Sequence, residues 1–250
     1  MAFRVAGLAF LLLTALGCAS RVALRAPEGE RWSAEQILKL HLDRSIAWES
    51  LFAALKVTVE MNESHWSATG SIQYLAGERI GIQFRQPYRF VLGDFFLTPS
   101  EFVYWGPFTS PQVIGNLDTL HLAHLLPLDL PDWDLRDLMP FPMGGRTGAF
   151  QLDSVAASGD TYILYGRTDK ASHRLKASAR RGEILQERVE HDGREPLIKV
   201  FRRYEVCQGW LVPTEVACST EDGRVCLTWK MEKPVLHALP RSSQVESILR

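Results

Sequence analysis

Histidines, aspartates and cysteines are the residues of this 250-residue sequence whose types and spacing could support chemistry. His121 and His124 stand three residues apart, so they share one face if the segment is helical. Zinc needs three or four ligands, and no cysteine or carboxylate stands near these histidines at a spacing typical of zinc sites. We therefore expect both histidines to pack against the domain or to face solvent, and we predict no metal site and no cofactor.

Acidic residues crowd two further segments. The aspartates lack the glycine and the terminal glutamate of a calcium-binding loop, so they are better explained as charges at a helix N-terminus. The second segment alternates in charge and is typical of the solvated side of a hairpin. The first set is Asp129, Asp132, Asp134 and Asp137, and the second is Glu187, Arg188, Glu190, Arg194 and Glu195.

Short catalytic motifs are missing from the sequence. It contains no G-x-S-x-G, no phosphate-binding loop, no H-E-x-x-H and no G-x-G-x-x-G. We therefore expect a protein that is not an enzyme, with an envelope hydrolase as a distant alternative. The 28 basic and 29 acidic residues give a net charge of −1, so no basic field exists to hold a nucleic acid.

The amino-terminal segment carries a cysteine in a setting that indicates lipid attachment. Arg4 precedes an uncharged apolar run that ends at Leu16, which is the anatomy of a signal peptide and too short for a membrane span. The sequence LTALGC that ends at Cys18 resembles a bacterial lipobox, in which the cysteine receives a diacylglycerol. This predicts a signal peptide over 1–17 and a lipidated anchor and tether over 18–32. The alternative is an ordinary secreted protein in which Cys18 is incidental.

The residue after Cys18 bears on location. Ala19 stands there rather than an aspartate. By resemblance to lipoprotein sorting in envelopes with two membranes, this favours a lipid-anchored protein on the periplasmic face of the outer membrane.

Three further cysteines, Cys207, Cys218 and Cys226, permit at most one disulfide. A hairpin turn at Asp222-Gly223 would place Cys218 opposite Leu227, so that Cys218 and Cys226 point to opposite faces of the sheet. That pairing is disfavoured, and we expect buried thiols.

The periodicity of the chain predicts one amphipathic helix followed by a long meander of strands. Ser33 and Gln36 form a capping box that opens a helix over 33–48, and a helical insert of two short helices broken by prolines is expected over 118–139. Elsewhere apolar and polar residues alternate between tight-turn dipeptides, as in antiparallel hairpins with one dry face. The predicted strands are 55–61, 66–74, 80–84, 88–97, 101–105, 148–155, 161–166, 172–179, 182–190, 197–206, 211–219 and 224–231.

A sheet of about 11 or 12 strands with one dry face must curve and be covered. We therefore predict a mainly β (α+β) domain over 33–235, followed by a C-terminal tail over 236–250. Its expected form is a strongly curved antiparallel sheet, or unclosed β-barrel, with the two helical segments as a lid over the concave face.

This layout resembles the LolA/LolB superfamily of bacterial lipoprotein carriers. The stretch FRQPYRF at 84–90 and FVYWG at 102–106 is similar to a strand pair of that superfamily. The resemblance implies a hydrophobic cavity for lipoprotein acyl chains, and the lipid anchor favours LolB, the receptor that takes its cargo from a periplasmic carrier protein. Phe95-Phe96-Leu97 is the nearest match to the receptor's exposed hydrophobic loop, with an ordinary end of a core strand as the alternative.

Two functional hypotheses are compatible with the apolar (dry) face of the sheet. The face encloses a pocket for acyl chains of lipoproteins or of another amphiphile, or it is filled, in which case the chain is an interaction or sensor lipoprotein of an envelope complex. We expect a monomer in both cases. The predicted ligand-lining residues are Trp66, Ile72, Tyr74, Ile82, Phe84, Phe90, Leu92, Phe102 and Tyr104, and the predicted lid residues are Ile37, Leu38, His41, Leu122 and Leu125.

Overall fold

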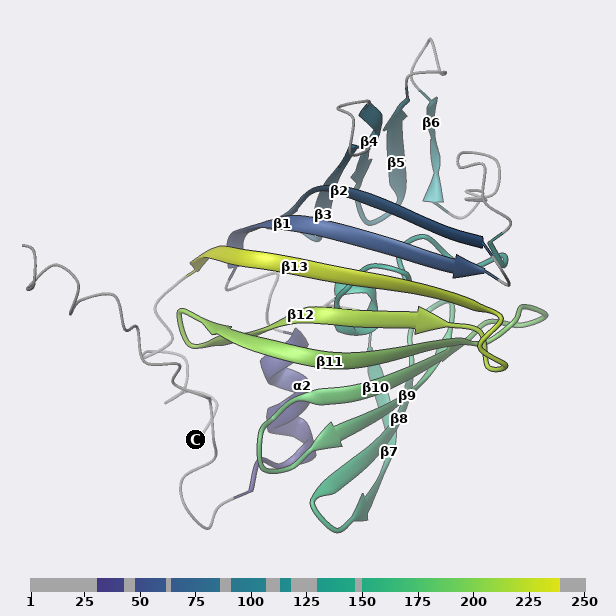
Figure 1. Ribbon diagram of the computed structural model, residues 1–250. Coiled ribbons are helices and arrows are strands. Elements are labelled where there is room, and N and C mark those ends of the chain that lie inside the picture. Colours follow the sequence, from purple (N-terminus) through teal and green to yellow (C-terminus); the bar gives the residue numbers. More distant parts are fainter. Residues whose placement is uncertain are drawn as a thin grey trace, which may run out of the picture.

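The computed structural model describes residues 31–42, 48–61, 64–85, 91–106, 113–117, 130–146 and 150–238. These residues form one antiparallel sheet of 13 strands in the order β6-β5-β4-β3-β2-β1-β13-β12-β11-β10-β9-β8-β7 (Figure 1). The strands are β1 (Trp48–Met61), β2 (Ser64–Leu75), β3 (Arg79–Arg85), β4 (Val91–Leu97), β5 (Glu101–Trp105), β6 (Val113–Asn116), β7 (Gln151–Ser158), β8 (Thr161–Arg167), β9 (Ser172–Ser178), β10 (Ile184–Glu190), β11 (Leu197–Cys207), β12 (Trp210–Ser219) and β13 (Val225–Ala238). This confirms the predicted curved, unclosed sheet.

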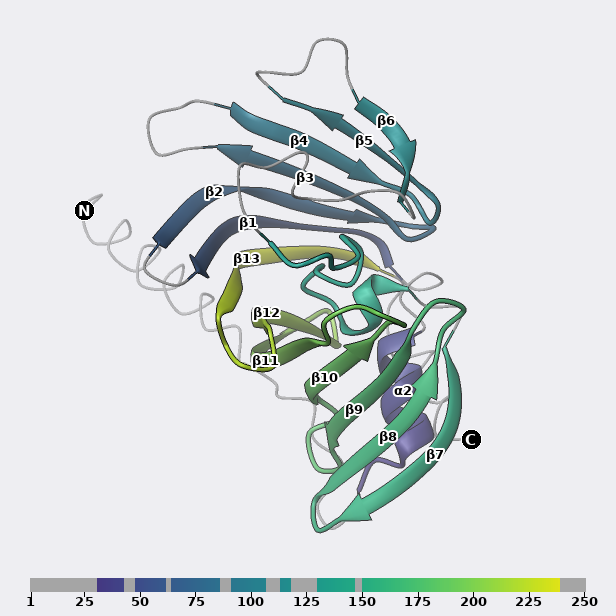
Figure 2. The same cartoon turned by 90° about the vertical axis from the view of Figure 1, so that its right-hand side faces the viewer.

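The strand order decides the path of the chain. Strands that follow one another pair as hairpins, and the two halves join where β1 pairs with β13. Because β6 and β7 then lie at opposite edges of the sheet, the chain that connects them must cross from one edge to the other. Figure 2 shows the described part of this connection on the concave side of the sheet, between strands β1–β6 and strands β7–β13, which we call its two wings. We refer to its described part, residues 130–146, as the plug.

Alternation of side chains gives the sheet its dry face. In β1, Leu51, Ala53, Leu55, Val57 and Val59 are buried, whereas the residues between them face outward. This is the period of two expected of a strand with one buried face, and it confirms the predicted meander. At its far end β13 continues to Ala238, past the predicted domain boundary at 235.

One α-helix, α2 (Ala34–Leu42), lies within the described residues. The predicted capping box is confirmed, because the Ser33 amide donates to Gln36 Oε1 at 2.8 Å and the Gln36 amide donates to Ser33 Oγ at 3.1 Å. The predicted extent to residue 48 is wrong. Trp48 begins β1 and pairs with Ala238, so long-range strand pairing outweighs the helical periodicity there.

The plug also differs from the expected helices. Residues 135–138 form a turn in an otherwise irregular segment, and the one helical element of the plug is a 3-10 turn, η3 (Pro142–Gly145). Pro131, Pro140 and Pro142 remove backbone donors, which is incompatible with a continuous helix. The remainder of the predicted insert, 118–129, lies outside the described residues. Strand β6 was not predicted, since its four residues are too few to show a period.

Candidate ligand-binding site

The concave face of the sheet is mainly apolar. Aromatic rings from separate strands meet edge to face there, with centroid distances of 5.7 Å for Trp48–Tyr74, 6.3 Å for Trp48–Trp210 and 5.9 Å for Phe84–Phe95. Such contacts add to the hydrophobic burial of the rings. The face is therefore suited to apolar material along its length.

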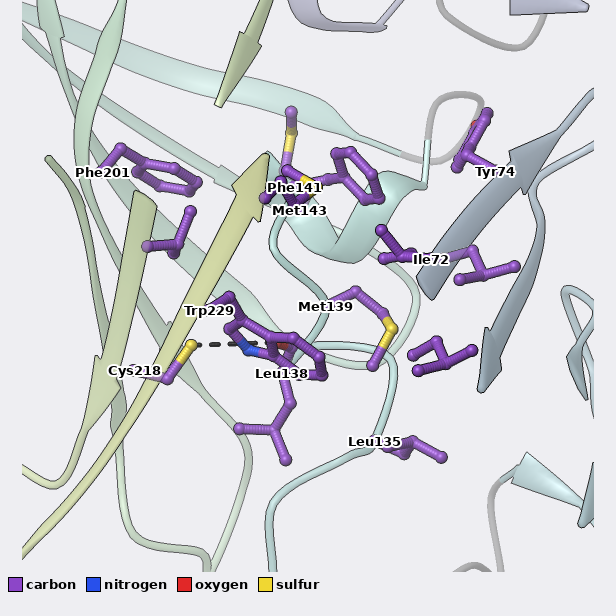
Figure 3. Packing of buried hydrophobic residues seen from close by; sticks show 14 of the residues in the cluster. Ile72, Tyr74, Leu135, Leu138, Met139, Phe141, Met143, Phe201, Cys218 and Trp229 are labelled. Carbon is purple, nitrogen blue, oxygen red and sulfur yellow. Dashed lines mark hydrogen bonds between the residues drawn. The ribbon is translucent and has the colours of Figure 1, made fainter. Parts of the chain in front are cut away.

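The plug occupies this face. Figure 3 shows its apolar side chains between Ile72 and Tyr74 on one wing and Phe201 and Trp229 on the other. The ring of Phe141 lies 5.4 Å from that of Tyr74. The concave face is therefore covered in this structure, as in the second hypothesis. The side chains that cover it come from the plug and not only from the strands. The buried apolar residues of the plug are Leu130, Trp133, Leu135, Leu138, Met139, Phe141 and Met143.

A first polar anchor ties the plug to two hairpin turns. Arg136, whose side chain is 1% exposed, donates to the carbonyl oxygen of Thr98 at 2.8 Å and to that of Glu78 at 2.7 Å. Its guanidinium also pairs with the Glu78 carboxylate at 3.3 Å. Burial lowers the pKa of Arg136, and Glu78 opposes that shift. Gly144 packs on the same arginine, since a Cβ there would lie 2.4 Å from the Arg136 carbonyl oxygen.

A second anchor joins the two ends of the plug and the β10–β11 loop. Arg146 pairs with Asp134 at 3.2 Å and with Asp137 at 2.5 Å, and Asp137 also accepts a hydrogen bond from His191 at 2.6 Å. Burial alone would raise the pKa of Asp137, but the hydrogen bond from His191 and the charge of Arg146 lower it. The prediction that these aspartates cap a helix is wrong, because no helix begins there and both carboxylates bind Arg146.

His191 is held in its charged form by this geometry. Its Nδ1 faces the Lys170 carbonyl oxygen at 2.9 Å and its Nε2 faces the Asp137 carboxylate, so both ring nitrogens must donate. The hydrogen bond to Asp137 raises the pKa of His191 above its ordinary value of 6.5. The stability that this contact contributes is complete below pH 6.5 and is lost as the pH rises through the raised pKa.

We expect the melting temperature to fall as the pH is raised above 6.5, and we expect His191→Gln, which keeps a donor but does not titrate, to flatten that fall. Calorimetry across pH 6 to 9 measures it. The matched control is His65→Gln, because His65 is exposed and its nearest carboxylate, on Glu60, is 3.8 Å away. A profile for His191→Gln as steep as that of the wild type would contradict the assignment.

The third anchor is a buried cluster beneath the plug. Glu187 is fully buried, and its carboxylate accepts hydrogen bonds from His173 at 2.9 Å and from the Met143 amide at 3.0 Å. Lys199 pairs with Glu187 at 3.2 Å and donates to the Phe141 carbonyl oxygen at 2.6 Å. Burial would raise the pKa of Glu187, but Lys199 and His173 outweigh it and lower that pKa. The cluster thus binds the backbone of the plug directly.

The prediction that Glu187 faces solvent is wrong, and the sequence held the signal that corrects it. Glu187 shares its strand parity with the buried Val189, His173 shares that of Leu175, and Lys199 shares that of Leu197. Burying a polar side chain on each of three neighbouring strands costs free energy unless the three side chains contact one another. The alternation of the three strands could therefore have predicted that Glu187, His173 and Lys199 form a buried cluster.

Most of the predicted lining residues do lie on the concave face. Trp66 is half-buried against the core, Phe90 lies outside the described residues, and Leu92 belongs to β4 but its side chain is not described. Of the predicted lid residues, Ile37, Leu38 and His41 are buried on α2, and His41 Nε2 lies 2.9 Å from the Gly182 carbonyl oxygen. Leu122 and Leu125 lie outside the described residues, as do His121, His124, Asp129 and Cys18. The lining residues that are buried are Ile72, Tyr74, Ile82, Phe84, Phe102 and Tyr104.

Two local predictions concern β4 and the cysteines. Phe95 and Leu97 are buried and Phe96 faces outward, so this segment is an ordinary core strand and not an exposed loop. Cys218 pairs with Leu227, as predicted, and all three described cysteines are free. Burial raises the pKa of the Cys218 thiol to about 12, so little of it is thiolate at neutral pH. No group of three metal-ligating side chains occurs among the described residues.

A hollow of about 350 Å³ lies where the plug begins. Leu130 and Pro131 of the plug, Met61 at the end of β1 and Val225 at the start of β13 form its apolar part. Thr220, Arg224, Glu195 and Ser64 supply polar atoms to its lining. The hollow is therefore an amphipathic mouth beside the filled concave face.

Comparison with known proteins gives a fold but no close relative. No protein-family model matches the chain, and no curated protein matches it. A LolA superfamily protein from Nitrosomonas europaea superposes with a TM-score of 0.61 at 9% identity, covering 84% of this chain and 96% of that one. A DUF1329 family protein from Desulfovibrio piger gives 0.61 at 10% identity, covering 87% and 98%. A putative outer membrane lipoprotein-sorting protein domain from Vibrio parahaemolyticus gives 0.59 at 10%, covering 87% and 100%.

The chain therefore has a LolA/LolB-like fold, with an open curved sheet, a helix at its side and a segment that crosses the concavity. Of these structural neighbours, the Vibrio parahaemolyticus protein is the one whose description mentions lipoprotein sorting.

Proposed function

We propose that this chain is an outer-membrane lipoprotein that binds the acyl chains of lipoproteins, or of another amphiphile, on the concave face of its sheet. In the bound state the plug moves aside and the acyl chain takes its place against the strands. The proposal extends to this chain what the lipoprotein-sorting description says of its structural neighbour.

The observation that carries the proposal is that the backbone hydrogen bonds of the sheet do not include the plug. All strand pairs are antiparallel ladders between the 13 strands, and the plug contributes no strand to them. The plug is bound through side chains and through a few contacts to its backbone. It can therefore leave as a unit, while the hydrogen-bonded framework stays intact.

Binding is then an exchange of one apolar occupant for another. Burial of an acyl chain contributes about 25 cal/mol per Å², and the affinity is what remains after the apolar side chains of the plug lose their own burial. The apparent affinity is reduced by the fraction of molecules in which the plug is closed. We infer that the amphipathic mouth at Met61, Leu130 and Val225 is where the acyl chain enters.

The test is binding of a fluorescent fatty acid, followed by energy transfer from the buried tryptophans of the concave face, among them Trp229. We expect saturable transfer that a diacylated lipopeptide displaces and the same peptide without acyl chains does not. Absence of saturable transfer, or equal displacement by both peptides, would count against the proposal.

A second candidate is an interaction or sensor lipoprotein whose interior stays filled. It is favoured by the depth of the plug, since Leu138, Met139 and Phe141 are each at most 1% exposed. Hydrogen exchange separates the two functions. In a carrier the amides of Met143 and Gly144 exchange faster than those of β1, whereas in a permanently filled protein both exchange only on global unfolding.

The lipid anchor makes a separate prediction. None of the helices in the described part of the chain is long and apolar enough to cross a membrane. If Cys18 carries the lipid, Cys18→Ser should move nearly all of the protein from the membrane fraction to the soluble periplasmic fraction, because the acyl chains supply the binding energy. Fractionation and immunoblotting measure this. A membrane fraction that does not change would refute the anchor, and Cys207→Ser serves as the control.

A further inference from the structure

A hollow of about 470 Å³ lies over β13, β1, β2 and β3, on the outer face of the sheet. Its lining includes the exposed side chains of Lys56, Thr69, Arg85 and Glu232 together with Ser71 and Gln83. These residues alternate with the buried positions of their strands, so the hollow is separated from the plug by the sheet itself. Figure 1 shows these four strands side by side.

Two lysines face each other across this surface. Lys56 of β1 stands directly opposite Lys230 of β13 in the strand register. Like charges at directly opposite positions destabilise a sheet, because the two ammonium groups repel each other at short range. A pair of this kind is explained if an anion binds between or beside the two charges.

The acids of the described chain compensate these cations only in part. Lys230 approaches Glu215 at 3.8 Å, but Glu215 is shared with Arg202 at the same distance. Lys56 has no carboxylate within ion-pair distance among the described residues. Glu232 also lines the hollow, but it is not within ion-pair distance of Lys56.

A third cation, Arg85, lies on the same surface. The register places Thr69 between Lys56 and Arg85 on neighbouring strands. The Arg85 guanidinium donates to Gln83 Oε1 at 2.7 Å and has no carboxylate within ion-pair distance in the described part of the chain. Its remaining N–H groups can therefore face a ligand.

The backbones of β2 and β3 lie unusually close together at Gly70. A Cβ on Gly70 would lie 1.7 Å from the carbonyl oxygen of Gln83, so β2 and β3 approach more closely than any other residue would permit. The register pairs Ser71 with Gln83 and Thr69 with Arg85 on either side of this approach. The hollow thus combines cationic groups with neutral donors.

We propose that this hollow binds a phosphate group. Within the lining, Lys56 and Arg85 outnumber Glu232, and Lys230 stands opposite Lys56 in the strand register. Hydroxyl groups supply neutral donors, and a guanidinium matches the tetrahedral oxygens of phosphate in a bidentate manner. The phosphate comes from a phospholipid headgroup or from free phosphate. This inference is independent of the proposed function, because the site lies on the other face of the sheet and needs no movement of the plug.

The test is thermal unfolding of the full-length chain in a non-ionic detergent. We expect inorganic phosphate at about one hundred times its dissociation constant to raise the melting temperature by about 5 °C beyond sodium chloride of equal ionic strength. The Lys56→Gln variant should lose this rise and, without phosphate, should melt no lower than the wild type because the repulsion is gone. The matched control is Lys176→Gln, an exposed strand lysine of β9 that should respond as the wild type does.

A second ligand identifies the source of the phosphate. Stabilisation by dihexanoylphosphatidylglycerol alone assigns the site to lipid headgroups, and stabilisation by inorganic phosphate alone assigns it to free phosphate; both support the site. The proposal is overturned if neither ligand exceeds sodium chloride. It is also overturned if Lys56→Gln responds like the wild type, or if that variant melts lower without phosphate.

Discussion

Oxidation of the Leu138→Cys variant should abolish binding of the fatty-acid probe, and reduction should restore it. The thiol of Cys218 lies 3.8 Å from the carbonyl oxygen of Leu138, so the plug backbone at this position is within reach of a disulfide to β12 (Figure 3). Such a bond holds the plug on the sheet. If the acyl chain must take the place of the plug, the locked protein should bind at least about 100-fold more weakly.

Two variants control for the loss of the leucine and for other thiols. Leu138→Ala removes the same side chain without adding a thiol, and its binding should not depend on redox conditions. Cys218→Ser in the Leu138→Cys background removes the partner thiol and should also abolish the redox effect. If the oxidised protein, with the disulfide verified by mass spectrometry, binds the probe as well as the reduced one, the ligand does not use the concave face.

Replacing Glu187 by alanine should destabilise the protein by about 3–5 kcal/mol, because it leaves Lys199 and His173 buried without their shared carboxylate. For a chain of this size the melting temperature should fall by about 10 °C. Denaturant titration measures the free energy of unfolding. The same change removes the acceptor of the Met143 amide, so the surviving folded protein should release its plug more readily and bind the probe more tightly.

The matched comparison removes both charges. Glu187→Leu combined with Lys199→Met should cost much less than Glu187→Ala, because well-packed apolar residues often replace a buried ion pair at little cost. A Glu187→Ala variant that loses under about 1 kcal/mol would show that water reaches the cluster and that it does not anchor the plug.

The sequence predicted the strands because each strand shows an alternation of apolar and polar residues over a few neighbouring positions. Alternation in segments such as 55–61 and 80–84 assigned residues to the dry face, and the structure buries Ile72, Ile82 and Phe84 there. The capping box at Ser33 was equally local and is confirmed. These features follow from neighbours within a few residues, so no tertiary information was needed.

The extent of the helix and the form of the plug were not predictable in this way. Trp48 fits a helical stripe by its spacing, but its pairing with Ala238 makes it the first residue of a strand. In the plug, the apolar residues around Leu138 satisfy a helical period, whereas the prolines and the contacts to Glu187 and Arg146 impose turns.

By itself the sequence determined which residues turn inward, since a strand of period two sorts its side chains without reference to the rest of the chain. Only the tertiary structure decided that the inward face is filled and by what. The pairing of β1 with β13 sends β6 and β7 to opposite edges, and the connection between them must then cross the concavity. That pairing joins residues from the two ends of the domain, and no local pattern encodes it.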